Sequence, residues 1–122
     1  MGPQAEAVLM KTLKDPEPAI RTAAVSALGD FGQDTHTMLI GRFLKDDAVI
    51  VRVAAAEALG KIGDVRAISM LDAALNDPSN QYRGASLWVR AHYTNALGNI
   101  GDAKAYPVLL KCLADGDARV VQ

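Results

Sequence analysis

Three arginines recur at matching places along the chain: Arg21, Arg52 and Arg90. A regular row of guanidinium groups could bind successive phosphates, because arginine donates paired hydrogen bonds to phosphate and carboxylate oxygens alike. The alternative is structural, with each guanidinium bound to an aspartate or a carbonyl in a neighbouring turn. We favour the structural interpretation, and we expect Asp64 and Asp102 to act as helix caps and as partners of this arginine ladder.

Other residues that could do chemistry are sparse. The two histidines, His36 and His92, stand alone, and we find no Gly-rich phosphate loop, no nucleophile elbow and no paired His-Glu motif. Acid–base catalysis would need two carboxyl groups that lie close together and have a raised pKa. The spacing of the aspartates does not indicate such a pair. The sequence therefore predicts no enzyme, no metal site and no cofactor.

Composition excludes several further classes of protein. The 122 residues carry a formal net charge of −1, whereas nucleic-acid-binding domains usually have a large basic excess. No apolar run is long enough to cross a membrane. The single cysteine, Cys112, rules out an internal disulfide, and we expect a cytoplasmic protein.

The elements that would position these residues come from internal repetition. The segment "VRVAAAEALGKIGD" at 51–64 matches "IRTAAVSALGDFGQ" at 20–33 and "VRAHYTNALGNIGD" at 89–102. The segments between them, such as "AISMLDAALNDP" and "AYPVLLKCLADG", repeat as well. Each copy reads as two helices, the first ended by glycines such as Gly60 and Gly63. Because one helix pair cannot bury its own apolar face, such units stack.

These residues resemble the HEAT-like repeat first described in phycobilisome chromophore lyases. The resemblance implies an all-α fold, a right-handed α-solenoid of stacked antiparallel helix pairs of the HEAT/armadillo kind. We expect a single domain over 1–122, with about three full repeats and partial ones at both ends, and a piece of a longer protein. We also expect that its uncapped ends allow a homo-oligomer to form.

An insertion interrupts the third copy. Residues 78–93 read "PSNQYRGASLWVRAHY", and the extra length either extends a helix or loops out. Aromatic and arginine side chains are frequent in binding hot spots. Filling of the core is the alternative for these side chains, and the candidates for partner binding are Tyr82, Arg83, Trp88 and His92.

A second candidate surface lies on the second helices of the pairs. Stacking would align basic side chains there into a short stripe, formed by Lys11, Arg42, Lys45 and Lys111. Such lysines can also simply complement the helix dipoles. If the stripe is functional, it suits an acidic protein segment better than a nucleic acid, whose affinity needs many phosphate contacts.

The leading hypothesis is a non-catalytic module that binds a protein partner. The alternatives are a relative of a bilin chromophore lyase, which would bind a bilin or its carrier protein, and a nucleic-acid-binding HEAT-like protein.

Overall fold

The chain is described by a computed structural model over residues 2–77 and 83–114, with side chains described over 2–77 and 89–111. These residues form helices and turns and contain no strand. The helices are α1 (Pro3–Thr12), α2 (Pro18–Phe31), α3 (Thr37–Arg42), α4 (Val49–Ile62), α5 (Ala67–Asn76), α6 (Arg83–Ile100) and α7 (Tyr106–Ala114). Short 3-10 turns flank some of them, at η1 (Asp34–His36), η2 (Phe43–Lys45) and η4 (Ala103–Ala105).

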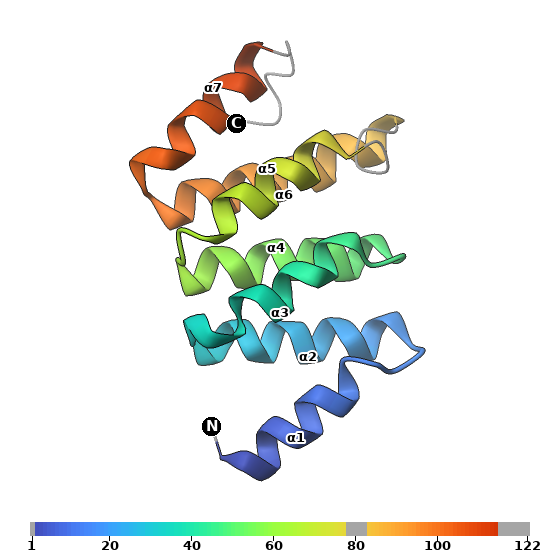
Figure 1. Cartoon of the computed structure of the whole chain (residues 1–122). Coiled ribbons are helices and arrows are strands. Elements are labelled where there is room, and N and C mark those ends of the chain that lie inside the picture. Colours follow the sequence, from blue (N-terminus) through green and yellow to red (C-terminus); the bar gives the residue numbers. More distant parts are fainter. Residues whose placement is uncertain (1, 78–82, 115–122) are drawn as a thin grey trace.

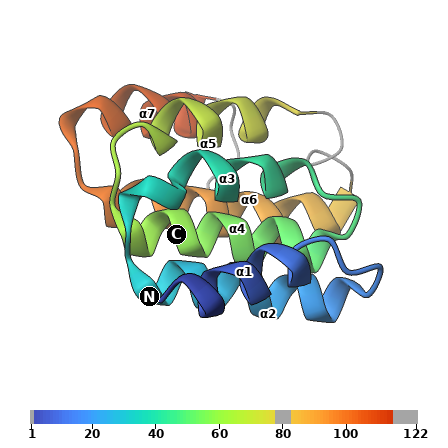
Figure 2. The same cartoon turned by 60° about the horizontal axis from the view of Figure 1, so that its bottom comes forward.

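The helices stack as antiparallel pairs in two layers (Figures 1 and 2). One layer holds α2, α4 and α6, and the other holds α1, α3, α5 and α7. Within the first layer α4 packs between α2 and α6, while α3, η2 and α5 cover the stack from the second layer. This arrangement confirms the predicted all-α solenoid.

Glycine ends each long helix of the first layer. Gly32, Gly63 and Gly101 follow α2, α4 and α6 with positive φ angles of 67°, 74° and 68°. An L-residue with a Cβ adopts this left-handed conformation only at a cost, so the repeated glycine fixes the turn into the second layer.

Gly60 does something else, and the expectation that it ends the helix is wrong. It lies inside α4, where a Cβ would come within 3.0 Å of the Ala96 Cα on α6. The equivalent Gly29 on α2 is approached still more closely by Ala58 of α4. Glycine and alanine therefore let neighbouring first-layer helices come close together.

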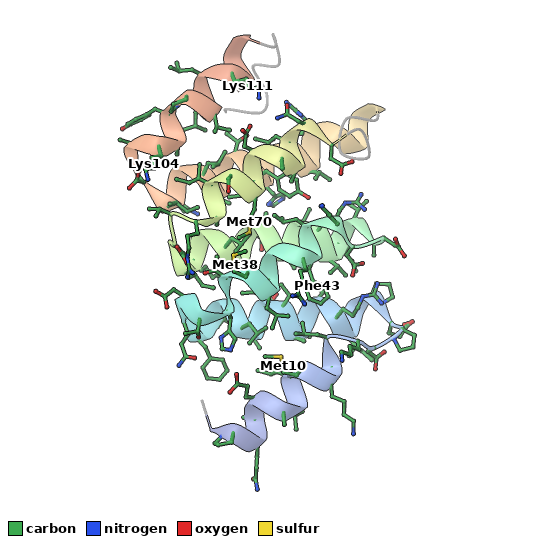
Figure 3. The ribbon with its side chains drawn as sticks, in the orientation of Figure 1. Met10, Met38, Phe43, Met70, Lys104 and Lys111 are labelled. Atoms are coloured by element: carbon green, nitrogen blue, oxygen red, sulfur yellow. The ribbon has the colours of Figure 1, made fainter. Side chains whose placement is uncertain are left out.

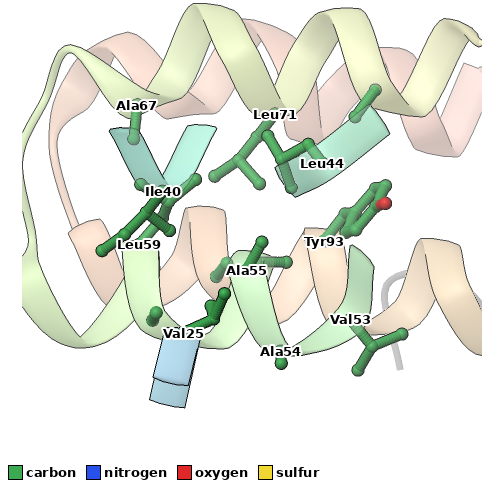
Figure 4. Packing of buried hydrophobic residues seen from close by; sticks show 14 of the residues in the cluster. Val25, Ile40, Leu44, Val53, Ala54, Ala55, Leu59, Ala67, Leu71 and Tyr93 are labelled. Atoms are coloured by element: carbon green, nitrogen blue, oxygen red, sulfur yellow. The ribbon is translucent and has the colours of Figure 1, made fainter. Parts of the chain in front are cut away.

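The core lies between the two layers (Figure 4). Alanines of α4 form its centre, with Ala55 and Ala56 fully buried and Ala54 and Ala58 nearly so. Larger side chains from both layers complete it, among them Val25, Leu28, Ile40, Leu59, Leu71 and Leu97. Small residues on α4 are needed because that helix has neighbours on several sides.

The third copy has a longer first-layer helix. α6 is 18 residues long, whereas α2 and α4 have 14 each, so part of the insertion extends the helix; residues 78–82 lie outside the described part. Tyr93 stands where α4 has Ala55, and its ring is fully buried in the core. At this position an aromatic ring fills the core.

Candidate functional site

Arg21 and Arg52 bind the turn that leads into α4, and Arg90 binds the last turn of α5. Arg21 reaches the next repeat, where its Nε and Nη2 donate to the Asp46 carboxylate at 3.0 and 2.9 Å. Arg52 donates to the carbonyls of Asp46 and Asp47 at 2.7 and 3.2 Å. Arg90 donates to the Leu75 carbonyl. The side chains of Arg52 and Arg90 are buried, so neither guanidinium faces solvent as a phosphate-binding row would.

The Arg21–Asp46 pair shifts the pKa of both groups. The hydrogen bonds that Arg21 donates to the Asp46 carboxylate are the main reason that the pKa of Arg21 is raised. Burial by itself would raise the pKa of Asp46, but hydrogen bonds from Arg21 and from the Ala48 amide outweigh it and lower the pKa. Both shifts stabilise the charged pair in the folded protein.

The aspartates after the first-layer helices organise the turns that follow. Asp64 accepts hydrogen bonds from the backbone amide of Arg66 at 3.0 Å and from its guanidinium at 2.7 Å. The Arg66 side chain is the largest cause of the strongly lowered pKa of Asp64. α5 begins only at Ala67, so Asp64 fixes the turn before the helix. Asp102 accepts the Lys104 amide at 2.8 Å and caps η4.

The insertion candidates are only partly described. Tyr82 lies outside the described residues, and Arg83 and Trp88 belong to α6 but their side chains lie outside them too. His92 Nδ1 lies 3.1 Å from Glu57 on α4, and its side chain is 28% exposed. His92 thus bridges two first-layer helices.

The basic stripe on the second layer is uneven. Lys11, Arg42 and Lys45 are exposed, and no salt bridge joins them to another of the described residues. Lys111 on α7 is also exposed, but its Nζ lies 3.5 Å from the Asp72 carboxylate of α5. The unpaired cations therefore lie on α1 and on α3 with η2.

A groove of about 520 Å³ runs between α3 and α5 on this same layer. Arg42 and Lys45 lie along one side of it, and Met38, Met70 and Ala73 give it an apolar surface. Met38 is 58% exposed. Met38 and Met70, labelled in Figure 3, both line the groove. An apolar groove bordered by cations can hold an apolar side chain next to an anionic group.

The methionines were not predicted as site residues, although the repeat carries a signal for them. Met38 occupies the place of Ala7, Ser69 and Pro107 in the other copies, and so brings a large apolar side chain to an exposed position. Gly41 replaces the larger residues of those copies. The Met70 sulfur packs directly against Gly41, so a Cβ there would displace the Met70 side chain. These two departures shape the groove.

No group of three or more potential metal ligands occurs among the described residues. No helix in the same part of the chain is long and apolar enough to cross a membrane. Arg21, Asp46, Lys61, Asp64 and Arg66 have shifted pKa values, and each belongs to an ion pair and does not line the groove.

Comparison with known families agrees with this fold. A sequence model of HEAT repeats matches residues 6–88, and one of the PBS lyase HEAT-like repeat matches residues 89–115. The chain therefore belongs to the HEAT-repeat proteins, as the sequence pattern predicted. No curated protein matches it significantly. HEAT-repeat families are generally non-catalytic, and their repeats generally mediate protein interactions.

Proposed function

We propose that this chain is a non-catalytic protein-interaction module, and that its partner binds the layer formed by α1, α3, α5 and α7. The observation that carries the proposal is the groove between α3 and α5. It combines the exposed Met38 with two cations, Arg42 and Lys45, that have no carboxylate partner among the described residues. Methionine adapts its shape to different apolar surfaces, which suits a protein-binding site.

The buried arginine ladder supports a protein partner over a nucleic acid. Arg52 and Arg90 are used inside the stack, and the net charge of the chain is −1. Nucleic-acid affinity comes mainly from many phosphate contacts, and the described part of the second layer offers only a small group of exposed cations to make them. A protein ligand needs fewer charges, provided that an apolar anchor is buried.

Site-specific photo-cross-linking tests this proposal. A photoreactive amino acid at Met38 should cross-link a partner in cells of the source organism, and mass spectrometry should identify it. The purified partner should then bind the unmodified chain, and Met38→Asp should weaken that binding.

The matched control is the same photoreactive residue at Ile50. Ile50 is also exposed, at 46%, but it lies on the first-layer helix α4. Cross-linking of the same protein from both positions, or of none from Met38, would contradict the proposal.

Two further expectations belong to this proposal. The lone Cys112 fits a reducing cytoplasm, which fractionation of the cells would test. Self-association through the ends of the stack is supported by Ile20 and Phe31 on α2, which are 41% and 47% exposed. Their equivalents on α4, Val51 and Ile62, are buried and half-buried. Sedimentation at increasing concentration would test for a dimer.

A further inference from the structure

Four exposed cations lie on the second layer in two successive repeats. Lys11 and Arg42 occupy equivalent places in successive repeats, as do Lys14 and Lys45. All four side chains are exposed, and none forms a salt bridge with another described residue. We call these four residues the basic cluster. It spans α1, the turn after it, α3 and η2.

The charge does not continue across the groove. The equivalent positions on α5 are Ala73 and Asn76, and on α7 Lys111 is already paired with Asp72 at 3.5 Å. Asp77 lies on the α5 side of the groove. The second layer therefore has two unlike halves, a cationic one over α1 and α3 and a largely neutral one over α5.

The groove lies at the boundary between these halves. Its volume of about 520 Å³ is large enough for one or two large apolar side chains, and Met38 and Met70 line it (Figure 3). Met38 is 58% exposed, and a ligand that covers its side chain would remove apolar surface from water. An occupant of this groove gains most by being apolar there and anionic on the α1 side.

We propose that the ligand is a partner-protein segment in which an acidic stretch adjoins an apolar anchor. The acidic stretch lies over the basic cluster, and the anchor enters the groove between α3 and α5. This inference rests on the proposed function, because it assumes that the second layer is the docking face. Charge complementarity sets which end of the segment lies over α1.

Short fluorescent peptides test the proposal by anisotropy with the 122-residue chain. The first peptide carries a run of glutamates followed by a leucine pair, the second has glutamines in place of the glutamates, and the third has serines in place of the leucines. The first should bind, and both substitutions should weaken binding by about tenfold. Raising the salt concentration should weaken the binding of the first peptide and leave the binding of the glutamine peptide almost unchanged.

Charge reversal locates the contact. The double variant Arg42→Glu, Lys45→Glu should bind the glutamate peptide about tenfold or more weakly than the parent does. It should also bind a version of the peptide in which lysines replace the glutamates. Both residues are exposed, so the variant should keep the circular dichroism and melting temperature of the parent. Lys104→Glu is the control, because Lys104 is exposed on η4 and does not line the groove.

The proposal is overturned if no peptide binds, or if the glutamate and glutamine peptides bind equally. It is also overturned if a single-stranded oligonucleotide binds as tightly as the first peptide, since that would show a general attraction for polyanions. These outcomes are separable from the proposed function. A partner cross-linked at Met38 through a segment without acidic residues would refute only the ligand, whereas failure of the Met38 cross-link would refute the docking face.

Discussion

Arg21 on α2 and Asp46, which precedes α4, form an ion pair through two hydrogen bonds of 3.0 and 2.9 Å. Asp46 is also bound from the other side, because its backbone carbonyl accepts Arg52 at 2.7 Å. Its carboxylate additionally accepts the Ala48 amide at 2.9 Å, at the start of α4. One aspartate therefore joins two successive arginines of the ladder to the beginning of a helix.

Because of this pair, we expect the free energy of unfolding to fall in acid. The pKa of Asp46 is lowered below its ordinary value of 3.8, so the unfolded chain takes up the proton more readily than the folded one. The contribution of Asp46 is complete above its ordinary pKa and is lost as the pH falls through the lower, folded value. Urea unfolding across the acid range should show this fall.

The variant Asp46→Asn should be less stable than the parent at neutral pH, and it should lose less additional stability in acid. Asp64→Asn leaves the Asp46 contribution in place and removes a second one, because the pKa of Asp64 is also lowered, so each variant should flatten part of the acid profile. Parallel pH profiles for the parent and Asp46→Asn would show that the Arg21–Asp46 pair does not matter for acid stability.

Arg52 should be more important for stability than an exposed arginine of the second layer. Its guanidinium is buried and bonds the carbonyls of Asp46 and Asp47. Arg52→Ala should therefore lower the free energy of unfolding by about 1–3 kcal/mol, since these carbonyls would lose their partner. Arg42→Ala, at an exposed site, should change it by less than about 0.5 kcal/mol. Equal midpoints in urea for the two variants would contradict the structural role of the ladder.

Equivalent glycines should respond in opposite ways to the same substitution. A Cβ on Gly29 would lie 2.7 Å from the Cβ and 2.8 Å from the Cα of Ala58, so the helices would have to separate. Gly29→Ala should lower stability by about 1–3 kcal/mol. At Gly98 no described atom lies within 4 Å of such a Cβ, and Gly98→Ala should raise stability by about 0.5–1 kcal/mol through helix propensity. Thermal melts of both variants decide it, and a stabilised Gly29→Ala would refute the close approach of α2 and α4.

The stack could be predicted from the sequence because the repeat pattern is formed by the residues that pack one helix against the next. The repeated leucines Leu28, Leu59 and Leu97 and the alanines of α4 are buried between helices, so their spacing reveals the architecture. The role of Gly60 could not be predicted from the sequence. A glycine that ends a helix and a glycine that allows two helices to pack closely look identical in a sequence. Only the approach of Ala96 distinguishes them.

The candidate site was predictable in part. The basic stripe followed from aligning the copies, but the pairing of Lys111 with Asp72 depends on side-chain positions that no alignment of repeats contains. The groove could not be predicted because it arises from a difference between copies, Gly41 beside Met70, whereas a repeat pattern consists of what the copies share. Tyr93 shows the same limit, since a tyrosine in an alanine position gave no indication of whether it would be buried.

Gly63 ends α4 in the left-handed backbone conformation. Gly63 has φ 74° and ψ 18°, and a Cβ there would meet no described atom within 4 Å. The cost of replacing it should therefore come from the backbone alone, about 1–2 kcal/mol for Gly63→Ala. Asparagine tolerates the left-handed conformation better than alanine, so Gly63→Asn should be the milder change although its side chain is larger. Chemical unfolding of both variants gives the order, and if Gly63→Asn proved the more damaging of the two, packing rather than backbone conformation would be the reason for this glycine.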